Sequence, residues 1–337
     1  MIKHITSLIF LGLLAVSASE RPRLAILTDI GGDLDDQQSM VRLMVYANEF
    51  DIELLLASAA GTPGELKESV TKPELIHEII TAYGAVLPHL RKHAEGWPEA
   101  EALHERVKSG NPHRGKAHIG EGHDTEGSRE LVKLIDSGSP ERPLNVAIWG
   151  GQTDLAQALW HVKQHRGSEG LSALTKRLRI YDIADQDGIA SWMRTEFPGL
   201  FYILNKAPQG HDRREAVFRG MYLTGDESLT SKQWITDHVK SRGPLGALYP
   251  MKTSNQPNPH GCMKEGDTPS WFFFLPLGGN DPNDPTKPGW GGEFQREPDG
   301  WWRDPLALEG FDPRSTVSRW REAFQADFAK RIQWCVD

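Results

Sequence analysis

The chain has 337 residues, a length that fits two average domains or one large α/β domain. It carries 38 basic and 46 acidic residues, and the net charge of −8 argues against nucleic acid or an anionic membrane as the main partner. The 33 glycines and 22 prolines indicate many loops, but 11 tryptophans and 12 phenylalanines argue against wholesale disorder. This composition is typical of a soluble protein that handles neutral or cationic small molecules.

The first residues are expected to be a secretory signal and not part of the fold. Lys3 and His4 precede an apolar run over residues 5–16, and the small residues 17–19 follow it. This order is typical of a signal peptide, and the run is shorter than the roughly 20 residues of a membrane anchor. We therefore predict a signal peptide over 1–18, export to the periplasm or the extracellular space, and a single domain over 19–337.

Two cysteines, Cys262 and Cys335, remain after the predicted cleavage. In an oxidising compartment they could form a disulfide, and two packed thiols are an equal alternative. They are too few for a zinc site of the multi-cysteine kind.

Strands and helices are predicted to alternate along the chain. The apolar run at 23–28 predicts a buried strand, and apolar residues at helical spacing predict a helix over 37–50. The same reasoning gives, in order, a strand at 52–59, helices at 72–86 and 98–109, a loop at 110–127, a strand at 143–149, a helix at 154–163, a strand at 178–183 and a helix through 192–197. This alternation predicts an α/β fold with a mostly parallel central sheet flanked by helices.

The last part of the chain has a different composition. Residues 243–313 are dense in Pro, Gly, Asn and Trp, and an amphipathic helix is expected over 316–336. A single helix could not form a second domain alone, so we predict that it packs on the first one or forms an oligomer face.

Four aspartates follow the first predicted strand within eight residues. Residues 28–36 read Thr-Asp-Ile-Gly-Gly-Asp-Leu-Asp-Asp, which places acids at Asp29, Asp33, Asp35 and Asp36. Ligands of open α/β sheets bind outside the carboxyl ends of the strands, and a hard divalent cation would relieve the repulsion among such acids. Oxygen ligands suit calcium or magnesium, although the spacing fits neither an EF-hand nor a P-loop. The alternative is acids that favour a helix start, with solvated neighbours.

Three further polar segments are candidates for the same site. Residues 149–154 offer carbonyls and the hydroxyl of Thr153, although threonine is also an ordinary N-cap. The Asp-Gln-Asp segment at 185–187 suits sugar hydroxyls. Asp267, before the apolar run at 271–277, could be a helix N-cap or a distant carboxylate that completes a metal site.

These segments, in this order, resemble the nucleoside hydrolases, and more closely a bacterial nucleoside hydrolase-like group that is sometimes described as cellulose-binding. The matching segments are Thr-Asp-Ile-Gly-Gly-Asp-Leu-Asp-Asp at 28–36, Gly-Glu-Gly-His-Asp-Thr-Glu-Gly-Ser at 120–128, Trp-Gly-Gly at 149–151, Asp-Gln-Asp at 185–187 and Glu-Gly-Asp-Thr-Pro-Ser at 265–270. The resemblance implies a nucleoside hydrolase-like fold over the whole mature chain.

The resemblance also implies a Ca²⁺ ion at the carboxyl end of the sheet. Asp29 and Asp36 would ligate it, together with the carbonyl of Thr153 and with Asp267. Asp29 would be the general base for a water molecule on the ion, and Asp35 would hold a sugar hydroxyl. The water would attack the anomeric carbon with inversion. The implied activity is hydrolysis of an N- or O-glycosidic bond in a nucleoside or glycoside.

The chain departs from the nucleoside hydrolases in three places. Their first loop is two residues tighter and begins with a further aspartate where Leu27 stands here. Gly266 replaces the histidine that protonates their leaving base. Their Asn- and Glu-bearing ribose loop has no evident copy, which leaves substrate binding to Asp185, Gln186 and Asp187. Candidates for the missing acid are Glu265, His260 and His123.

Carbohydrate binding without turnover is the alternative function. Tryptophans in polar loops could stack on sugar faces or could fill the core. They are Trp271, which we assign to substrate binding, and Trp290, Trp301 and Trp302. In both readings the partner is a small nucleoside or sugar, with no nucleic acid and no stable membrane span, and the resemblance allows a homo-oligomer.

Overall fold

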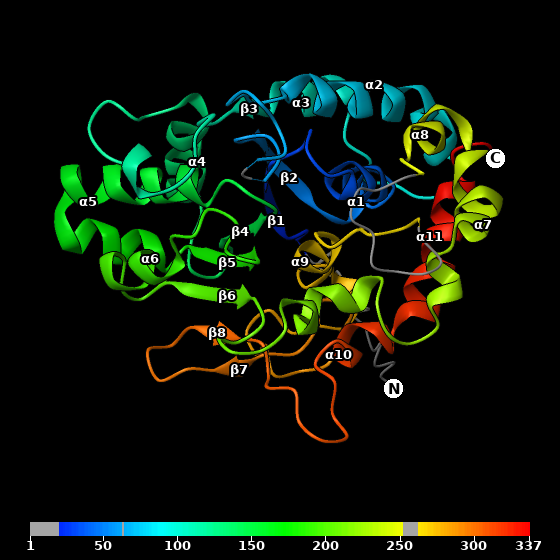
Figure 1. Cartoon of the computed structure of the whole chain (residues 1–337). Helices are drawn as coiled ribbons and strands as arrows, with labels where there is room; N and C mark the ends of the chain where they lie inside the picture. Colours follow the sequence, from blue (N-terminus) through cyan, green and yellow to red (C-terminus); the bar gives the residue numbers. More distant parts are fainter. Residues whose placement is uncertain (1–19, 63, 252–261) are drawn as a thin grey trace, which may run out of the picture.

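The structure is a computed structural model that describes residues 20–62, 64–251 and 262–337. The described residues contain an eight-stranded sheet with the strand order β3-β2-β1-β4-β5-β6-β8-β7 (Figure 1). The strands are β1 (Arg23–Thr28), β2 (Asp51–Ala57), β3 (Val107–Ser109), β4 (Leu144–Ile148), β5 (Leu178–Ile183), β6 (Phe201–Asn205), β7 (Gln295–Arg296) and β8 (Trp302–Arg303). Neighbouring strands are parallel except β7, which is antiparallel to β8. The predicted α/β class with a mostly parallel sheet is therefore confirmed.

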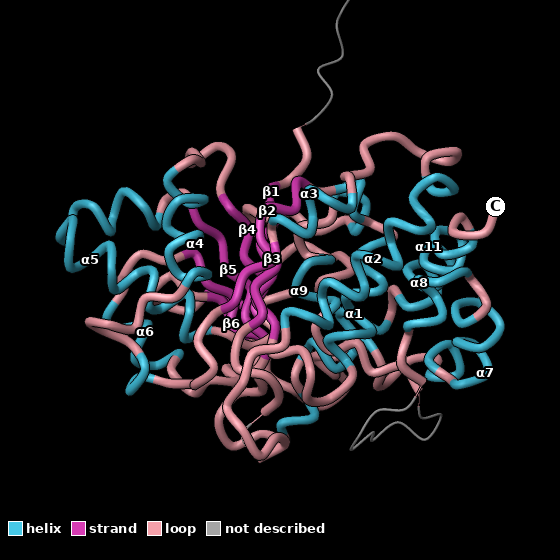
Figure 2. Tube along the Cα trace, turned by 90° about the horizontal axis from the view of Figure 1, so that it is seen from above, coloured by secondary structure: helices cyan, strands magenta, loops and turns pink. Residues whose placement is uncertain are grey.

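Helices cover both faces of this sheet (Figure 2). On one face lie α4 (Glu126–Asp136), α5 (Gln152–Thr175) and α6 (Ala190–Glu196); on the other lie α1 (Asp35–Met44), α2 (Pro73–Leu90), α9 (Thr268–Phe272) and α11 (Arg321–Gln333). Alternate residues of β1 enter different hydrophobic clusters, Leu24 and Ile26 on one face and Ala25 and Leu27 on the other. Burial on both faces explains why the strands are almost continuously apolar.

The strand order reverses beside β1. The chain adds β2 and β3 on one side of β1, and it later adds β4, β5 and β6 on the other side. Loops that leave β1 and β4 therefore diverge and open a crevice at the carboxyl ends, where ligands of such sheets bind. Residues 29–34 follow β1 and residues 149–151 follow β4. Two of the polar segments singled out in the sequence thus border this crevice.

Some elements differ from the sequence prediction. The helix expected over 98–109 is only α3 (Ala100–Glu105), because the next residues pair with β2 as the edge strand β3. The short helix α4 and the strand β6 were not predicted. A short strand is stabilised mainly by its neighbours in the sheet, so its own residues give a weak signal.

The Pro- and Gly-rich part of the chain joins the same sheet. It contributes α8 (Gly243–Leu248), α9, and the strands β7 and β8, of which β8 pairs with β6. It also holds part of the core, since Phe272, Phe273 and Phe274 are buried. The expected final helix is divided between α10 (Ser315–Ser318) and α11.

The predicted signal peptide, 1–18, lies outside the described residues. Within the described part, we find no helix with the length and apolar character that a membrane crossing requires. Cys262 and Cys335 are both buried free thiols, which corresponds to the packed alternative and not to a disulfide. Burial raises the pKa of Cys262 to about 11 and that of Cys335 to about 12.

Candidate functional site

The first polar loop places its aspartates in different surroundings. Asp29 directly follows β1, whereas Asp35 and Asp36 are the first two residues of α1. Asp33 forms an ion pair with Lys264, and the Thr28 hydroxyl donates a hydrogen bond to Asp36 Oδ1. Asp29 and Asp36 are buried, each with 4% exposure. The loop thus directs two carboxylates inward at the edge of the sheet.

Asp267 joins this group from the far end of the chain. Carboxylate oxygens of Asp35, Asp36 and Asp267 lie within 4.8 Å of one another. Asp267 occupies the N-cap position of α9 but makes no capping hydrogen bond through its side chain. Its Oδ2 atom is buried and has no hydrogen-bond partner among the described residues. The Asp267 carboxylate therefore lies beside the carboxylates of Asp35 and Asp36 and does not cap the helix.

Burial and mutual repulsion change the protonation of these acids. Burial, with the charges of Asp29, Asp267 and Asp35, raises the pKa of Asp36 well above its usual value. Burial, with the charges of Asp35 and Asp29, does the same to the pKa of Asp267. Burial raises the pKa of Asp29 to about 6, against the lowering effect of Arg114. Such a cluster is unfavourable when ionised and would be stabilised by a divalent cation.

Helix α1 holds the Asp267 loop in place. The Gln38 side chain accepts a hydrogen bond from the Lys264 backbone N–H at 2.8 Å and donates one to the Cys262 carbonyl at 2.9 Å. One turn further, Arg42 forms a fully buried ion pair with Glu265, with 2.5 Å between Nε and Oε2. These contacts from α1 explain how Asp267 reaches the start of the same helix.

The loop after β4 approaches Asp29 closely. Gly150 has a φ of +151°, and a Cβ atom there would lie 2.6 Å from the Cβ of Asp29. Any larger residue would therefore push the two loops apart. The Trp-Gly-Gly segment thus has a steric reason to contain glycine at this point.

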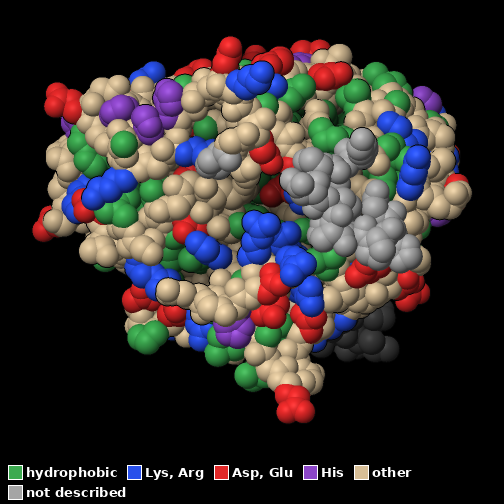
Figure 3. All heavy atoms as spheres, in the orientation of Figure 1, with side chains coloured by type: hydrophobic (Ala, Val, Ile, Leu, Met, Phe, Trp, Pro, Cys, Tyr) green, Lys and Arg blue, Asp and Glu red, His purple; other side chains and the backbone are tan. Residues whose placement is uncertain are grey.

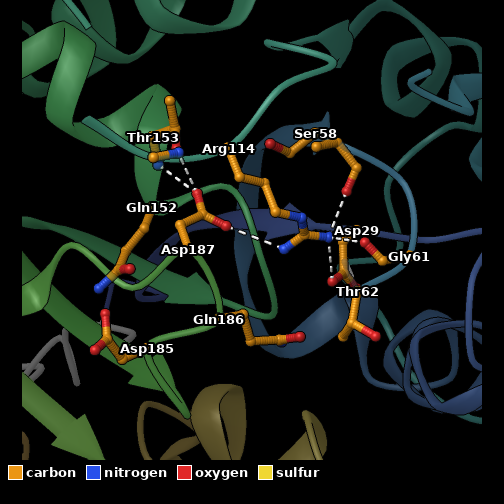
Figure 4. Close-up of polar contacts among 12 residues, drawn as sticks. Asp29, Ser58, Gly61, Thr62, Arg114, Gln152, Thr153, Asp185, Gln186 and Asp187 are labelled. Atoms are coloured by element: carbon orange, nitrogen blue, oxygen red, sulfur yellow. Dashed lines mark hydrogen bonds and ion pairs between the residues drawn. The ribbon is translucent and has the colours of Figure 1, made fainter. Parts of the chain in front are cut away.

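Arg114 is a site residue that no motif or spacing in the sequence marked. Its guanidinium lies between two carboxylates, with Nη2 2.8 Å from Asp29 and Nη1 3.0 Å from Asp187 (Figure 4). It also donates to the carbonyls of Ala59 and Gly61, which follow β2. Arg114 comes from the Gly- and His-rich loop after β3, which shows no periodic pattern, so only the packed structure reveals it.

Thr153 and Asp187 contact each other in the structure. The N–H and the hydroxyl of Thr153 both donate to Asp187 Oδ2, at 2.7 and 2.6 Å. The Thr153 hydroxyl also accepts from the Gly115 N–H at 2.8 Å. Asp187, with a side chain 1% exposed, therefore positions Arg114 and the start of α5, and its assignment to substrate binding stays a prediction. The Thr153 carbonyl as a metal ligand stays a prediction.

The other three residues predicted to bind substrate, Gln186, Asp185 and Trp271, lie in three different surroundings. Gln186 lines the cavity described below. Asp185 accepts hydrogen bonds from the Ala190 N–H and from Lys206, each at 2.9 Å. The Trp271 ring is fully buried, and it packs against Tyr46 with 5.3 Å between ring centroids. Trp271 is therefore a core residue, and its assignment to substrate binding does not agree with the structure.

The two described candidates for a leaving-group acid, Glu265 and His123, are engaged elsewhere. Glu265 is fully buried, paired with Arg42 and hydrogen-bonded to Tyr249 and Thr268, so it has no free face toward a ligand. His123 belongs to a different loop, with its ring 6.1 Å from that of His118. His260 lies outside the described residues.

Phe218 occupies the space beside the position where the resemblance leads one to expect an acid. A Cβ atom on Gly266 would lie 3.2 Å from the Phe218 ring and 3.5 Å from Asp35 Oδ2. A side chain at position 266 would therefore require this ring to shift by a few tenths of an ångström.

A cavity of about 500 Å³ opens above the acidic cluster. Asp35 and Asp267 line one part of it, and Gln186 and Phe218 line another. Figure 3 shows acidic side chains within this hollow and basic side chains beside it. Its size falls in the range of small-molecule sites in proteins.

Asp154, which the sequence analysis treated only as part of a turn, connects three segments. It accepts hydrogen bonds from the Ser58 hydroxyl, the Asn111 N–H and the Thr125 hydroxyl, at 2.6, 2.8 and 3.1 Å. Burial raises the pKa of this carboxyl from its usual 3.8 to about 7, and the hydrogen bonds only partly oppose that rise. Asp154 thus connects the loops around the site, but its ionised form is unfavourable because the carboxyl is buried.

Asp154→Asn should weaken the dependence of stability on pH. Between about pH 4 and 7 the folded chain holds a proton that the unfolded chain has lost, so the stabilisation is lost as pH rises through 7. Asparagine cannot ionise, and the slope of the unfolding free energy should flatten by up to about 1.4 kcal/mol per pH unit. Urea unfolding of both proteins from pH 5 to 8, with a chelator present, measures this. Equal slopes would contradict the prediction.

Comparison with known proteins gives one family match. The family model of the cellulose-binding Sde182, nucleoside hydrolase-like domain matches residues 23–294. Among solved structures, the chain is similar to a nucleoside hydrolase-related hypothetical protein from Saccharophagus degradans that is associated with carbohydrate metabolism. The two are 30% identical with a TM-score of 0.73, and the match covers 94% of this chain and 72% of that chain. The effector protein XOO4466 gives a TM-score of 0.47 at 8% identity, with 95% of each chain covered. No functionally curated protein matches the chain.

Proposed function

Because the chain belongs to the family of Sde182-like, nucleoside hydrolase-like domains, we propose that it is an exported, calcium-dependent hydrolase of a glycosidic bond in a sugar compound. The observation that carries this proposal is the meeting of Asp35, Asp36 and Asp267 below a cavity at the crevice of the sheet. Export rests on the sequence pattern of residues 1–18 alone.

The donor set fits a hard cation. All candidate ligands are oxygen atoms, which calcium prefers, and the unpartnered, buried Asp267 Oδ2 supplies a polar atom that the protein itself leaves unsatisfied. Asp36 and Asp267, which belong to the group of three carboxylates, would hold the ion. Asp29, which lies outside that group but raises the pKa of Asp36 by its charge, and the Thr153 carbonyl are the further ligands that we propose. When bound, calcium would offset the charge of these carboxylates and lower the pKa of a water molecule.

The residues around the cluster have distinct proposed roles. Asp29 would take the proton of the attacking water, since a carboxylate with a pKa near 6 accepts a proton more readily than an ordinary aspartate. Arg114 would fix the orientation of the Asp29 carboxylate through its ion pair. Asp35 lines the cavity and would hold a sugar hydroxyl. The remaining negative charge would favour the positive, oxocarbenium-like transition state of glycoside hydrolysis.

The proposed hydrolase needs a substrate with a good leaving group. No side chain at position 266 can protonate the leaving group, because this residue is glycine, and the neighbouring Glu265 is paired with Arg42. Aryl glycosides and nucleosides with acidic bases are therefore the substrates expected to react.

Sugar binding without turnover is the second candidate function, and the missing leaving-group acid at position 266 favours it. The Phe218 ring beside Gly266 leaves little space for an acid, and the family model carries a cellulose-binding description. Such a protein would keep the cavity and the cation while lacking one part of the catalytic set.

A screen for released sugar tests the two functions against each other. Nucleosides and aryl glycosides would be incubated with the purified chain in calcium or in a chelator, and reducing sugar would be measured. We expect release that requires calcium. Sugar binding by calorimetry in calcium, without release from any compound, would contradict the hydrolase and support the binding function.

A further inference from the structure

The cavity above the acidic cluster also has a positively charged side. Lys206, Arg213, Arg219 and Lys264 all line it, together with Asp35 and Asp267, and Lys264 is the one of these four cations that lies beside Asp35. Figure 3 shows basic side chains gathered beside the hollow. The segment that carries three of them, 206–219, starts at the carboxyl end of β6. The cavity therefore has two charged sides of opposite sign.

Two of these four cations are already neutralised within the protein. Lys264 pairs with Asp33 and lies 3.3 Å from Asp35. Lys206 lies 2.9 Å from Asp185. The charges of Lys264 and Lys206 are thus largely compensated by neighbouring carboxylates.

Arg213 and Arg219 form no ion pair of this kind within the described chain, although the pKa of the neighbouring Asp212 is lowered by Arg214 and, to a smaller extent, by the charge of Arg213. Across the described ranges, neither guanidinium has a carboxylate within ion-pair distance, in contrast to Arg214, which pairs with Asp212 at 2.7 Å. Arg219 is held in place by other contacts: its Nε donates to the Arg213 carbonyl at 3.1 Å, and one Nη donates to the Tyr222 hydroxyl. Its guanidinium lies 4.8 Å from the centre of the Phe218 ring, and its other Nη has no carboxylate partner among the described residues. Arginine side chains with free donors bind carboxylate and phosphate groups through paired hydrogen bonds.

We propose that the cavity binds an anionic sugar compound, with its carboxylate or phosphate on Arg213 and Arg219 and its sugar ring over the acidic cluster. This assignment names the substrate class of the proposed hydrolase, and the placement of the ring rests on that proposed function. The two charged sides within one cavity of about 500 Å³ are suited to a ligand with an anionic end and a neutral, hydroxyl-bearing end.

The first test compares anionic sugars with their neutral partners. Calorimetry in calcium would use free sugars, which have no glycosidic bond: glucuronate against glucose, galacturonate against galactose, and ribose 5-phosphate against ribose. At least one anionic sugar should bind about tenfold or more tightly than its neutral partner, and that advantage should decrease with added salt. The uronate and phosphate arms distinguish the two sources of the anion. Equal affinity within every pair would overturn the proposal.

The second test changes the two arginines. Arg213→Gln and Arg219→Gln, together, should reduce the affinity for the anionic sugar to that of its neutral partner. Arg214→Gln is the matched control, because it removes the same charge from a neighbouring residue outside the cavity lining. A control variant as weak as the double variant, or a double variant with native affinity, would overturn the proposal. Melting temperatures would confirm that each variant is folded.

The outcomes separate this inference from the proposed function. Because free sugars are not hydrolysed, their binding does not depend on turnover. Sugar release without a preference for anionic compounds would overturn this inference but would still support the proposed hydrolase. A preference for anionic sugars without release would support the inference and contradict the hydrolase.

Discussion

Replacing Asp36 with asparagine should lower the affinity for calcium on the order of 100-fold or more. The variant keeps the shape of the side chain and an oxygen that accepts from Thr28, but it removes one charge from the group with Asp35 and Asp267. Calcium affinity depends strongly on the charge of its ligands. Calorimetry with calcium chloride measures the loss directly, and thermal unfolding shows it as the disappearance of calcium-dependent stabilisation.

The same variant should have the opposite effect on stability when calcium is removed. Burial and three neighbouring charges raise the pKa of Asp36, so its ionised form opposes folding near neutral pH. In a chelator, Asp36→Asn should therefore unfold at a higher temperature than the native protein, whereas in calcium it should unfold at a lower one. Such a reversal would not follow from a purely structural role.

Asp33→Asn is the matched control for this experiment. It removes the same charge from the same loop, but Asp33 is paired with Lys264 and is outside the group of Asp35, Asp36 and Asp267. It should change calcium affinity by only a few-fold. If Asp36→Asn and Asp33→Asn both bound calcium with native affinity, the proposed metal site would be contradicted.

Asp29→Asn should reduce kcat by about 10³-fold on whichever substrate the screen identifies. A general base typically contributes 10²- to 10⁴-fold, and asparagine cannot accept the proton. The measurement must be made at saturating calcium, because Asp29 is also a proposed ligand of the ion. Asp284→Asn, which removes a carboxylate that pairs with Lys287 and does not line the cavity, serves as the control and should keep the native kcat.

The pH dependence of kcat gives a second readout of the same residue. The pKa of Asp29 is raised to about 6 without an ion, and a bound cation would lower it, so kcat should fall with decreasing pH at or below about 6. The residual activity of Asp29→Asn should lack this decrease. A variant with kcat within tenfold of the native value and an unchanged pH profile would mean that another group is the base.

The sequence alone determined the fold class and the location of the acidic cluster. Strand β1 is a run of buried residues between a signal-like segment and an acidic loop, and its pattern is local, so it can be read without neighbours. The position of Asp29 after a buried strand follows from the same pattern, because the carboxyl ends of parallel strands share one edge. The Asp267 segment was recognisable by its resemblance to a family, and the structure places its carboxylate beside Asp35 and Asp36.

Only the tertiary structure decided what each polar or aromatic side chain contacts. Arg114 forms an ion pair with Asp29 from a loop without a periodic pattern, and Glu265 forms one with Arg42. Trp271 is fully buried in the core. None of these partners is close in sequence, so no spacing or composition encodes the pairing. The net charge of −8 suggested a neutral or cationic ligand, yet charge averaged over a chain does not describe a cavity. Packing brings Arg213 and Arg219 to its wall without an ion pair to either among the described residues, because local charge depends on which side chains the fold assembles.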